Sequence, residues 1–266
     1  MPHVHVNGLL THYCDRGMGH PILFVHGFPL NCRMWQSELD ALALDYRVIA
    51  PDLRGFGQSE ANGEATVTME QYADDLAALL DELGINEPVT FCGLSMGGYI
   101  GWQFLRKYHD RLDSLVLCDT RASADAPEGR QARYKLADDV LQNGPEVAAE
   151  AMIPKLFASC TLEHRPEMVE QVRDMILHTD PHAIAAASRG MAERPDMTGS
   201  LADVDLPTLV MVGKEDTITP PDEMRDLARS INGAIVAEIP EAGHVAPMEN
   251  PKAVTGSLCR FLKTLQ

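Results

Sequence analysis

Short apolar runs that alternate with amphipathic stretches are the feature that most constrains the fold of this chain. Amphipathic stretches, such as residues 34–44 and 69–83, carry apolar side chains at helical spacing. The continuous apolar runs predict buried strands at residues 21–25, 46–50, 88–92, 112–118, 207–212 and 234–239. Strands that alternate with helices indicate βαβ units, so we expect an α/β fold with a mostly parallel central sheet and helices on both faces.

The alternation stops between residues 120 and 197, where no strand pattern is present. Prolines separate a series of helical patterns there, at residues 130–142, 145–158, 166–178 and 181–192. We therefore expect a helical insertion at 120–197, packed over one edge of a core formed by residues 1–119 and 198–266. Near the start of the core, Asn7-Gly8 between alternating residues predicts a β-hairpin.

Charge and cysteine content exclude several classes of partner. The chain has 22 Lys and Arg against 39 Asp and Glu, a net charge of −17, which argues against binding nucleic acids or anionic membranes. We see no run of about 20 apolar residues and no signal-peptide pattern, and the six cysteines lack C-x-x-C spacing. A cytoplasmic location with reduced cysteines is expected. His3, His5 and His12 lie in the predicted hairpin, and the His3-x-His5 pair has no cysteine or carboxylate nearby at ligand spacing, so neither a metal nor a cofactor is expected.

The sequence Gly93-Leu94-Ser95-Met96-Gly97 is the strongest sign of chemistry. It is a G-x-S-x-G motif between a predicted strand and a predicted helix. Such a turn exposes the serine hydroxyl, because only small residues fit two positions on either side. Ser95 is therefore the predicted nucleophile, with capping of the following helix as the alternative.

A serine nucleophile needs a histidine base and a carboxylate that orients it. Asp216 follows the strand 207–212, and His244 follows the strand 234–239. The order Ser95, Asp216, His244 is the one used by hydrolases that carry this motif. The sequence leaves other acids open, namely Glu215, Asp222 and Asp119.

Acyl transfer also needs two backbone N–H groups aimed at the developing oxyanion. Met96, the residue after the nucleophile, is expected to supply one. Phe28, in His26-Gly27-Phe28-Pro29 after the strand 21–25, is expected to supply the other. His26 itself is interpreted as a structural hydrogen-bonding residue in preference to a proton shuttle.

Five ordered motifs resemble those of the α/β-hydrolase superfamily. They cover nearly the whole chain outside the helical insertion and lie at residues 26–29, 52–59, 93–98, 213–216 and 243–244. Within the superfamily the chain is similar to small carboxylesterases, 3-oxoadipate enol-lactonase-like hydrolases and cofactor-free perhydrolases. The resemblance implies Ser95 as nucleophile, Asp216 as acid, His244 as base, and a cap formed by the insertion. A serine at this position argues against dehalogenases and epoxide hydrolases of this fold, which need a carboxylate nucleophile.

The substrate is expected to bind between the sheet edge and the cap. An apolar pocket there would suit small to medium esters, although packing between helices is an equal alternative for the cap residues. Besides Phe28 and Met96, the candidate lining residues are Leu30, Leu156, Phe157, Met191 and Val245. Arg121 is a candidate partner for a substrate carboxylate, with a salt bridge to an acidic side chain as the alternative.

The function expected from these features is hydrolysis of small carboxylic esters or lactones through an acyl-enzyme, by a monomer or small homo-oligomer. Two alternatives stay open. Peroxide could replace water on the same acyl-enzyme and give a perhydrolase, or the chain could be a slow-turnover ligand receptor on the same fold.

Overall fold

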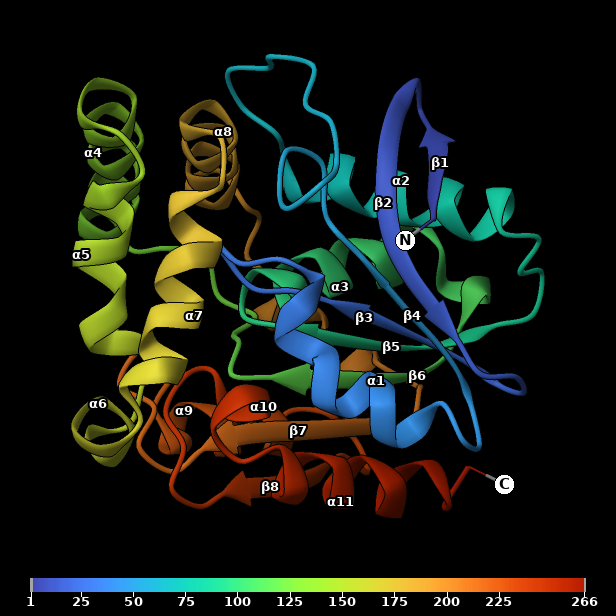
Figure 1. The fold of residues 1–266 in the computed structure, drawn as a ribbon. Coiled ribbons are helices and arrows are strands. Elements are labelled where there is room, and N and C mark those ends of the chain that lie inside the picture. The colour runs from blue at the N-terminus through green and yellow to red at the C-terminus, as the bar shows by residue number, and fades with distance from the viewer. Residues whose placement is uncertain (1, 266) are drawn as a thin grey trace.

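A computed structural model describes residues 2–265 and has one eight-stranded sheet at its centre, in the order β1-β2-β4-β3-β5-β6-β7-β8 (Figure 1). β2 pairs antiparallel with β1 and β4, and all other pairs are parallel. The α/β fold with a mostly parallel sheet is therefore confirmed. The strands are β1 (His3–Val6), β2 (Leu9–Arg16), β3 (Pro21–Val25), β4 (Arg47–Pro51), β5 (Val89–Leu94), β6 (Leu112–Cys118), β7 (Thr208–Gly213) and β8 (Ile235–Ile239).

Helices cover both faces of the sheet. α1 packs against α11 on one face, and α2 packs against α3 on the other (Figure 1). Every residue of β3 and β5 is buried, as expected for doubly covered parallel strands. Of the helices in residues 2–265, none is both long and apolar enough to cross a membrane. The core helices are η1 (Cys32–Trp35), α1 (Gln36–Leu42), α2 (Met69–Glu82), α3 (Met96–Lys107), η2 (His109–Arg111), η3 (Thr198–Asp203), α9 (Pro221–Arg229), α10 (Ala246–Glu249) and α11 (Pro251–Leu262).

Local sequence signals explain where several elements begin. Asn7 and Gly8 have φ values of 48° and 83°, the left-handed conformations that a two-residue hairpin turn between β1 and β2 requires. Thr68 and Gln71 form a reciprocal capping box that fixes the start of α2. The hairpin and this helix therefore follow from short-range chemistry alone.

The segment between β6 and β7 is helical and lies beyond the carboxyl ends of the parallel strands, at the left of Figure 1. α4 packs against α8, and α5 packs against α7. The helix predicted at 145–158 ends at Leu156, because Phe157 and Ala158 are extended and the Ala158 N–H donates to the Glu249 carboxylate at 2.8 Å. The helices are α4 (Pro127–Asn143), α5 (Glu146–Leu156), α6 (Ser159–His164), α7 (Pro166–Leu177) and α8 (Pro181–Ala192).

The register of the sheet brings the carboxyl ends of its central strands together. Val25 at the end of β3 pairs with Gly93, and Leu94 at the end of β5 pairs with Cys118. The loops that follow these strands, and the loops after β7 and β8, therefore leave the sheet at one edge.

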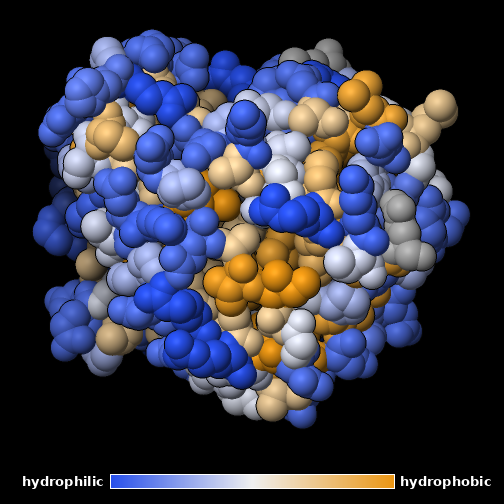
Figure 2. All heavy atoms as spheres, turned by 90° about the horizontal axis from the view of Figure 1, so that it is seen from below, coloured by the Kyte–Doolittle hydropathy of each residue, from blue (hydrophilic) through white to orange (hydrophobic). Residues whose placement is uncertain are grey.

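β8 is the last strand in the order of the sheet, and this edge strand exposes Ile235 and Val236. Figure 2 views the molecule from below, the side of β8 and α11 in Figure 1, and shows apolar surface gathered on that face.

Candidate active site

Ser95 lies on the sharp turn between β5 and α3, with a φ of 53° and a ψ of −111°. The two flanking glycines have a steric reason. A Cβ at Gly93 would lie 2.4 Å from the carbonyl oxygen of Gly97, and a Cβ at Gly97 would lie 2.3 Å from that of Val25. The turn can therefore form only with glycine at both positions. It leaves Ser95 partly exposed, although every residue of β5 before it is buried.

The structure brings Ser95, His244 and Asp216 into one hydrogen-bonded chain. Ser95 Oγ lies 2.8 Å from His244 Nε2, and His244 Nδ1 lies 2.8 Å from Asp216 Oδ2. Asp216 follows β7 and His244 follows β8, so two loops from neighbouring strands deliver the carboxylate and the imidazole. Both residues are almost completely buried, Asp216 at 3% and His244 at 2% exposure, and this shields their interaction from water.

Hydrogen bonds hold Asp216 in its ionised form. The N–H groups of Ile218 and Thr219 donate to Oδ1, at 2.8 and 3.1 Å, and the Thr219 hydroxyl donates to Oδ2. Burial alone would raise the pKa of Asp216, but the charge of His244 and the hydrogen bonds from His244 and Thr219 outweigh it and lower this pKa. A carboxylate is therefore present beside His244 at neutral pH.

The other acids considered from the sequence make other contacts. Asp119, at the end of β6, accepts the Gly213 N–H at 2.7 Å, and burial together with the charge of Asp216 raises its pKa well above the usual value. Glu215 is exposed, and Asp222 pairs with Arg225 on the surface of α9. Asp216 is the carboxylate within hydrogen-bonding distance of His244.

The loop after β3 lies directly beside Ser95. A Cβ added at Gly27 would be 3.5 Å from the Ser95 Cβ, so the backbone of Phe28 is in the same small region. Met96 is the first residue of α3, where N–H groups have no acceptor inside the helix. His26 binds two backbone groups of this region: its Nδ1 lies 2.9 Å from the Gly27 carbonyl, and its Nε2 accepts from the Leu53 N–H at 3.0 Å. Burial lowers the pKa of His26, so the ring is neutral.

The candidate substrate-lining residues are all buried. Leu156 joins the helical segment to the histidine loop, since its carbonyl accepts the N–H groups of His244 at 2.9 Å and Val245 at 3.2 Å. Phe157 follows in sequence, and Leu30 closes the turn after β3. Met191 lies on α8, where its sulfur is 3.3 Å from Arg133 Nη1. The structure thus places part of this set beside His244, and Met191 on a helix of the insertion.

Arg121 forms the salt bridge that the sequence left as an alternative. Its Nε lies 3.1 Å from Glu223 Oε1, and its Nη2 donates to Glu223 Oε2 at 3.1 Å and to the Ile218 carbonyl. Because Ile218 also donates its N–H to Asp216, Arg121 supports the loop that carries the acid.

Two residues that support the site have no motif in the sequence. Thr219 donates to Asp216 and lies 3.4 Å from His244 Nδ1. Glu249 accepts the N–H of Gly243 at 2.8 Å and that of Ala158, so it fixes the residue before His244 against the insertion. The local pattern Asp216-x-x-Thr219 could have indicated the contact between Thr219 and Asp216. No local pattern indicates the contacts of Glu249 with Gly243 and Ala158.

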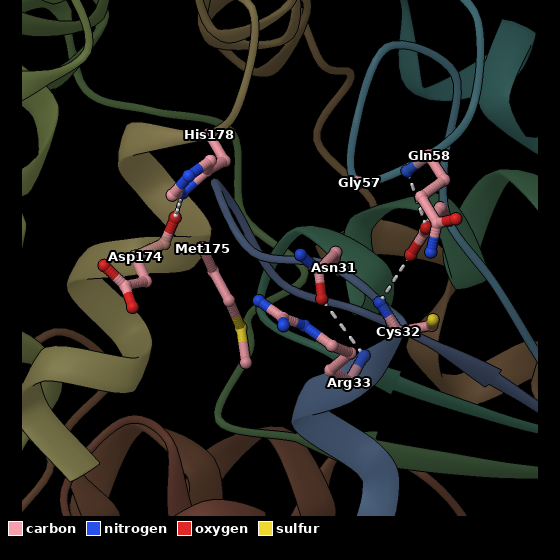
Figure 3. Close-up of a pocket in the computed structure, with 9 residues that line it drawn as sticks. Asn31, Cys32, Arg33, Gly57, Gln58, Asp174, Met175 and His178 are labelled. Carbon is pink, nitrogen blue, oxygen red and sulfur yellow. Dashed lines mark hydrogen bonds between the residues drawn. The ribbon is translucent and has the colours of Figure 1, made fainter. Parts of the chain in front are cut away.

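A cavity of about 280 Å³ lies between the core loops and α7. Figure 3 shows Met175 of α7 and His178, which directly follows α7, on one side and Asn31, Cys32 and Gln58 on the other. Ser95 is not among its lining residues.

Comparisons with known proteins show which family this fold belongs to. A family model described as alpha/beta hydrolase fold matches residues 20–251. A thermophilic esterase from Thermogutta terrifontis, solved with malate bound, is 45% identical with a TM-score of 0.97, over 100% of this chain and 99% of that one. The 3-oxoadipate enol-lactonase 2 of Acinetobacter baylyi is 28% identical over 91% of this chain and 88% of its own length. The candidate non-heme bromoperoxidase BpoC of Mycobacterium tuberculosis (strain ATCC 25618 / H37Rv) is 29% identical over 96% of this chain and 98% of its own length.

Proposed function

The chain belongs to the alpha/beta hydrolase fold family, and we propose that it is a serine hydrolase that cleaves carboxylic ester or lactone bonds through an acyl-enzyme on Ser95. The observation that carries this proposal is the position of His244, whose two ring nitrogens each lie 2.8 Å from a partner, Ser95 Oγ on one side and Asp216 Oδ2 on the other. The esterase and enol-lactonase among the similar proteins support the same class of reaction.

In the first half of the reaction Ser95 Oγ attacks the ester carbonyl while His244 Nε2 takes the hydroxyl proton. Asp216 accepts a hydrogen bond from the Nδ1–H of His244, which fixes the imidazole tautomer and stabilises its charged form. The N–H groups of Phe28 and Met96 stabilise the tetrahedral oxyanion. His244 then gives its proton to the departing alcohol, and the acyl group stays on Ser95.

In the second half the same histidine activates water, which attacks the acyl-enzyme and releases the acid. The base, the nucleophile and the oxyanion donors of both halves all belong to this chain. Removal of one oxyanion donor in such a site costs about 10²–10³ in kcat, so the loop after β3 is expected to contribute measurably to the rate.

We propose that residues 120–197 form a cap and that the acyl group binds between this cap and the sheet edge. Leu156, Phe157 and Val245 support this, because the Leu156 carbonyl holds the backbone of the loop that carries His244. An apolar site of this kind accepts small to medium acyl or aryl groups through burial of their carbon surface.

The proposal is tested with Ser95→Ala and, as a matched control, Ser230→Ala, which removes an exposed hydroxyl at the end of α9. Wild type and Ser230→Ala are expected to hydrolyse p-nitrophenyl acetate and to be labelled once by a fluorophosphonate, on the peptide that contains Ser95. Ser95→Ala should lose both properties. Hydrolysis by Ser95→Ala at a rate near that of wild type contradicts the proposal.

Perhydrolysis is a second candidate because of the similarity to the M. tuberculosis protein over nearly the full length. In that reaction hydrogen peroxide replaces water and releases a peracid, which oxidises bromide. Bromination of monochlorodimedone in acetate, peroxide and bromide measures it, and a rate above that of ester hydrolysis would favour the perhydrolase.

A further inference from the structure

Three metal-binding side chains converge at a buried point outside the Ser95 site. His12 Nδ1, Cys32 Sγ and a carboxylate oxygen of Asp52 all lie within 4.8 Å of one another. His12 comes from β2, Cys32 begins η1, and Asp52 directly follows β4, so the three come from separate parts of the core. No metal site is expected from the sequence, whereas the fold brings a cysteine and a carboxylate to His12.

The separations are close to those of a tetrahedral zinc site. Zn²⁺ ligands at about 2.0–2.3 Å from the metal lie roughly 3.2–3.8 Å from one another. Cys32 Sγ is 4.0 Å from His12 Nδ1, so it needs to move by only a few tenths of an ångström. His12 Nδ1 and Asp52 Oδ2 are 2.7 Å apart and must separate by about half an ångström, as the ion takes the place of the shared proton.

The donor set selects the kind of metal. One thiolate, one imidazole and one carboxylate suit a borderline-soft ion such as Zn²⁺, whereas Mg²⁺ and Ca²⁺ prefer oxygen ligands alone. Binding requires that Cys32 lose its thiol proton and that the ring proton of His12 lie on Nε2. The thiolate and the carboxylate then balance the two charges of the ion, so a neutral cluster is buried.

The surroundings hold the carboxylate in place. Asp52 Oδ1 accepts the Cys32 N–H at 2.8 Å, and Oδ2 accepts the Gln58 N–H at 2.9 Å. A Cβ at Gly57 would lie 2.2 Å from Asp52 Oδ2, so glycine at position 57 leaves room for the carboxylate. Such outer contacts orient metal ligands in known sites.

The cavity of about 280 Å³ described above gives an ion a route to this point. Cys32 and Asp52 are among its lining residues, together with Asn31, Gln58 and residues of α7 (Figure 3). The cavity also has room for a water molecule as the fourth ligand.

We propose that His12, Cys32 and Asp52 form a binding site for a zinc-like divalent cation, with water from the cavity in the fourth position. The site links β2, η1 and the loop after β4, and η1 closely follows the residues that lie beside Ser95. Its expected role is to stabilise the core, and it does not depend on the proposed hydrolase function.

Cobalt(II) tests the site, because a bound thiolate gives a near-ultraviolet charge-transfer band. The reduced, chelator-treated protein is titrated with Co²⁺ and then with Zn²⁺, which should displace it. We expect a band that saturates near one Co²⁺ per chain and a melting temperature that rises with Zn²⁺. Cys32→Ser should lose the band and weaken binding at least about tenfold, while its circular dichroism and ester hydrolysis show that it is folded.

Two control variants separate this site from other thiol chemistry. Cys160→Ser removes an exposed cysteine and should keep the band. Cys14 Sγ lies 4.0 Å from Cys32 Sγ but is outside the three-atom cluster, so Cys14→Ser should also keep it. The proposal is wrong if no charge-transfer band forms, if the band survives in Cys32→Ser, or if Cys14→Ser loses it equally.

Discussion

Replacement of Asp216 by asparagine is the most informative perturbation of the proposed site. Two backbone N–H groups, from Ile218 and Thr219, donate to Oδ1. An asparagine must therefore keep its carbonyl oxygen at that position and turn its NH₂ group toward His244. An NH₂ group cannot accept the Nδ1 proton, so the ring proton moves to Nε2, and Nε2 can no longer accept the proton of Ser95.

The expected loss in kcat is about 10⁴-fold, the size found when a triad carboxylate becomes an amide and the histidine takes the wrong tautomer. This corresponds to about 5 kcal/mol of transition-state stabilisation. The assay is hydrolysis of p-nitrophenyl acetate, with the near-ultraviolet circular dichroism compared first to establish that the variant is folded.

Asp119→Asn is the matched control, because Asp119 is also buried at the end of a neighbouring strand. Burial and the charge of Asp216 raise the pKa of Asp119 well above the usual value, and an asparagine can still accept the Gly213 N–H through its carbonyl oxygen. We expect kcat to stay within about tenfold of wild type, the equivalent of one ordinary hydrogen bond. Equal losses in the two variants, or near-normal activity in Asp216→Asn, would refute the tautomer argument.

Three further outcomes are expected. Gly97→Ala places a Cβ 2.3 Å from the Val25 carbonyl oxygen, so we expect a loss of about 1–3 kcal/mol in unfolding free energy and a large loss of activity; unchanged chemical denaturation would contradict the steric account. Glu38→Gln should raise the melting temperature by roughly 2–4 °C at pH 7 and leave it unchanged near pH 4. Burial raises the pKa of Glu38 well above the usual value, so the carboxyl group destabilises the folded state only as the pH rises above the pKa of the unfolded state. A gain in melting temperature at both pH values would show another cause. Arg121→Ala should lower hydrolysis of neutral and carboxylate-bearing esters alike, since Arg121 pairs with Glu223 and supports the Asp216 loop; a selective loss for carboxylate-bearing esters would instead assign it to substrate binding.

The parts of the fold that the sequence predicted are those with short-range causes. The hairpin at Asn7 and Gly8 follows from backbone conformations that few residues adopt, and the strands of the parallel sheet are continuous apolar runs. Asp216 and His244 could be proposed as partners of Ser95 because each follows a parallel strand, and the carboxyl ends of such strands meet at one edge.

Contacts between distant segments were not predictable in this way. The early end of the helix predicted at 145–158 goes with a contact of Glu249, whose carboxylate is about 90 positions away from the Ala158 N–H that it binds. Neither residue has a neighbour that indicates the contact. The Thr219 contact is different, because Thr219 lies three positions after Asp216 and its hydroxyl donates to that carboxylate.

The cluster of His12, Cys32 and Asp52 explains why spacing rules fail for some sites and hold for others. A zinc-finger pattern places ligands two to five residues apart, so that one turn presents them together. Here the ligands are 20 positions apart, and one lies on β2, which runs antiparallel to its neighbours, so the rule for the ends of parallel strands does not reach it. Only the register of β2 against β4, which pairs Cys14 with Ala50 and Tyr13 with Pro51, brings His12 level with Asp52. A shift of that register by one residue would turn His12 to the other face of the sheet, so the antiparallel pairing, and not any local motif, creates this cluster.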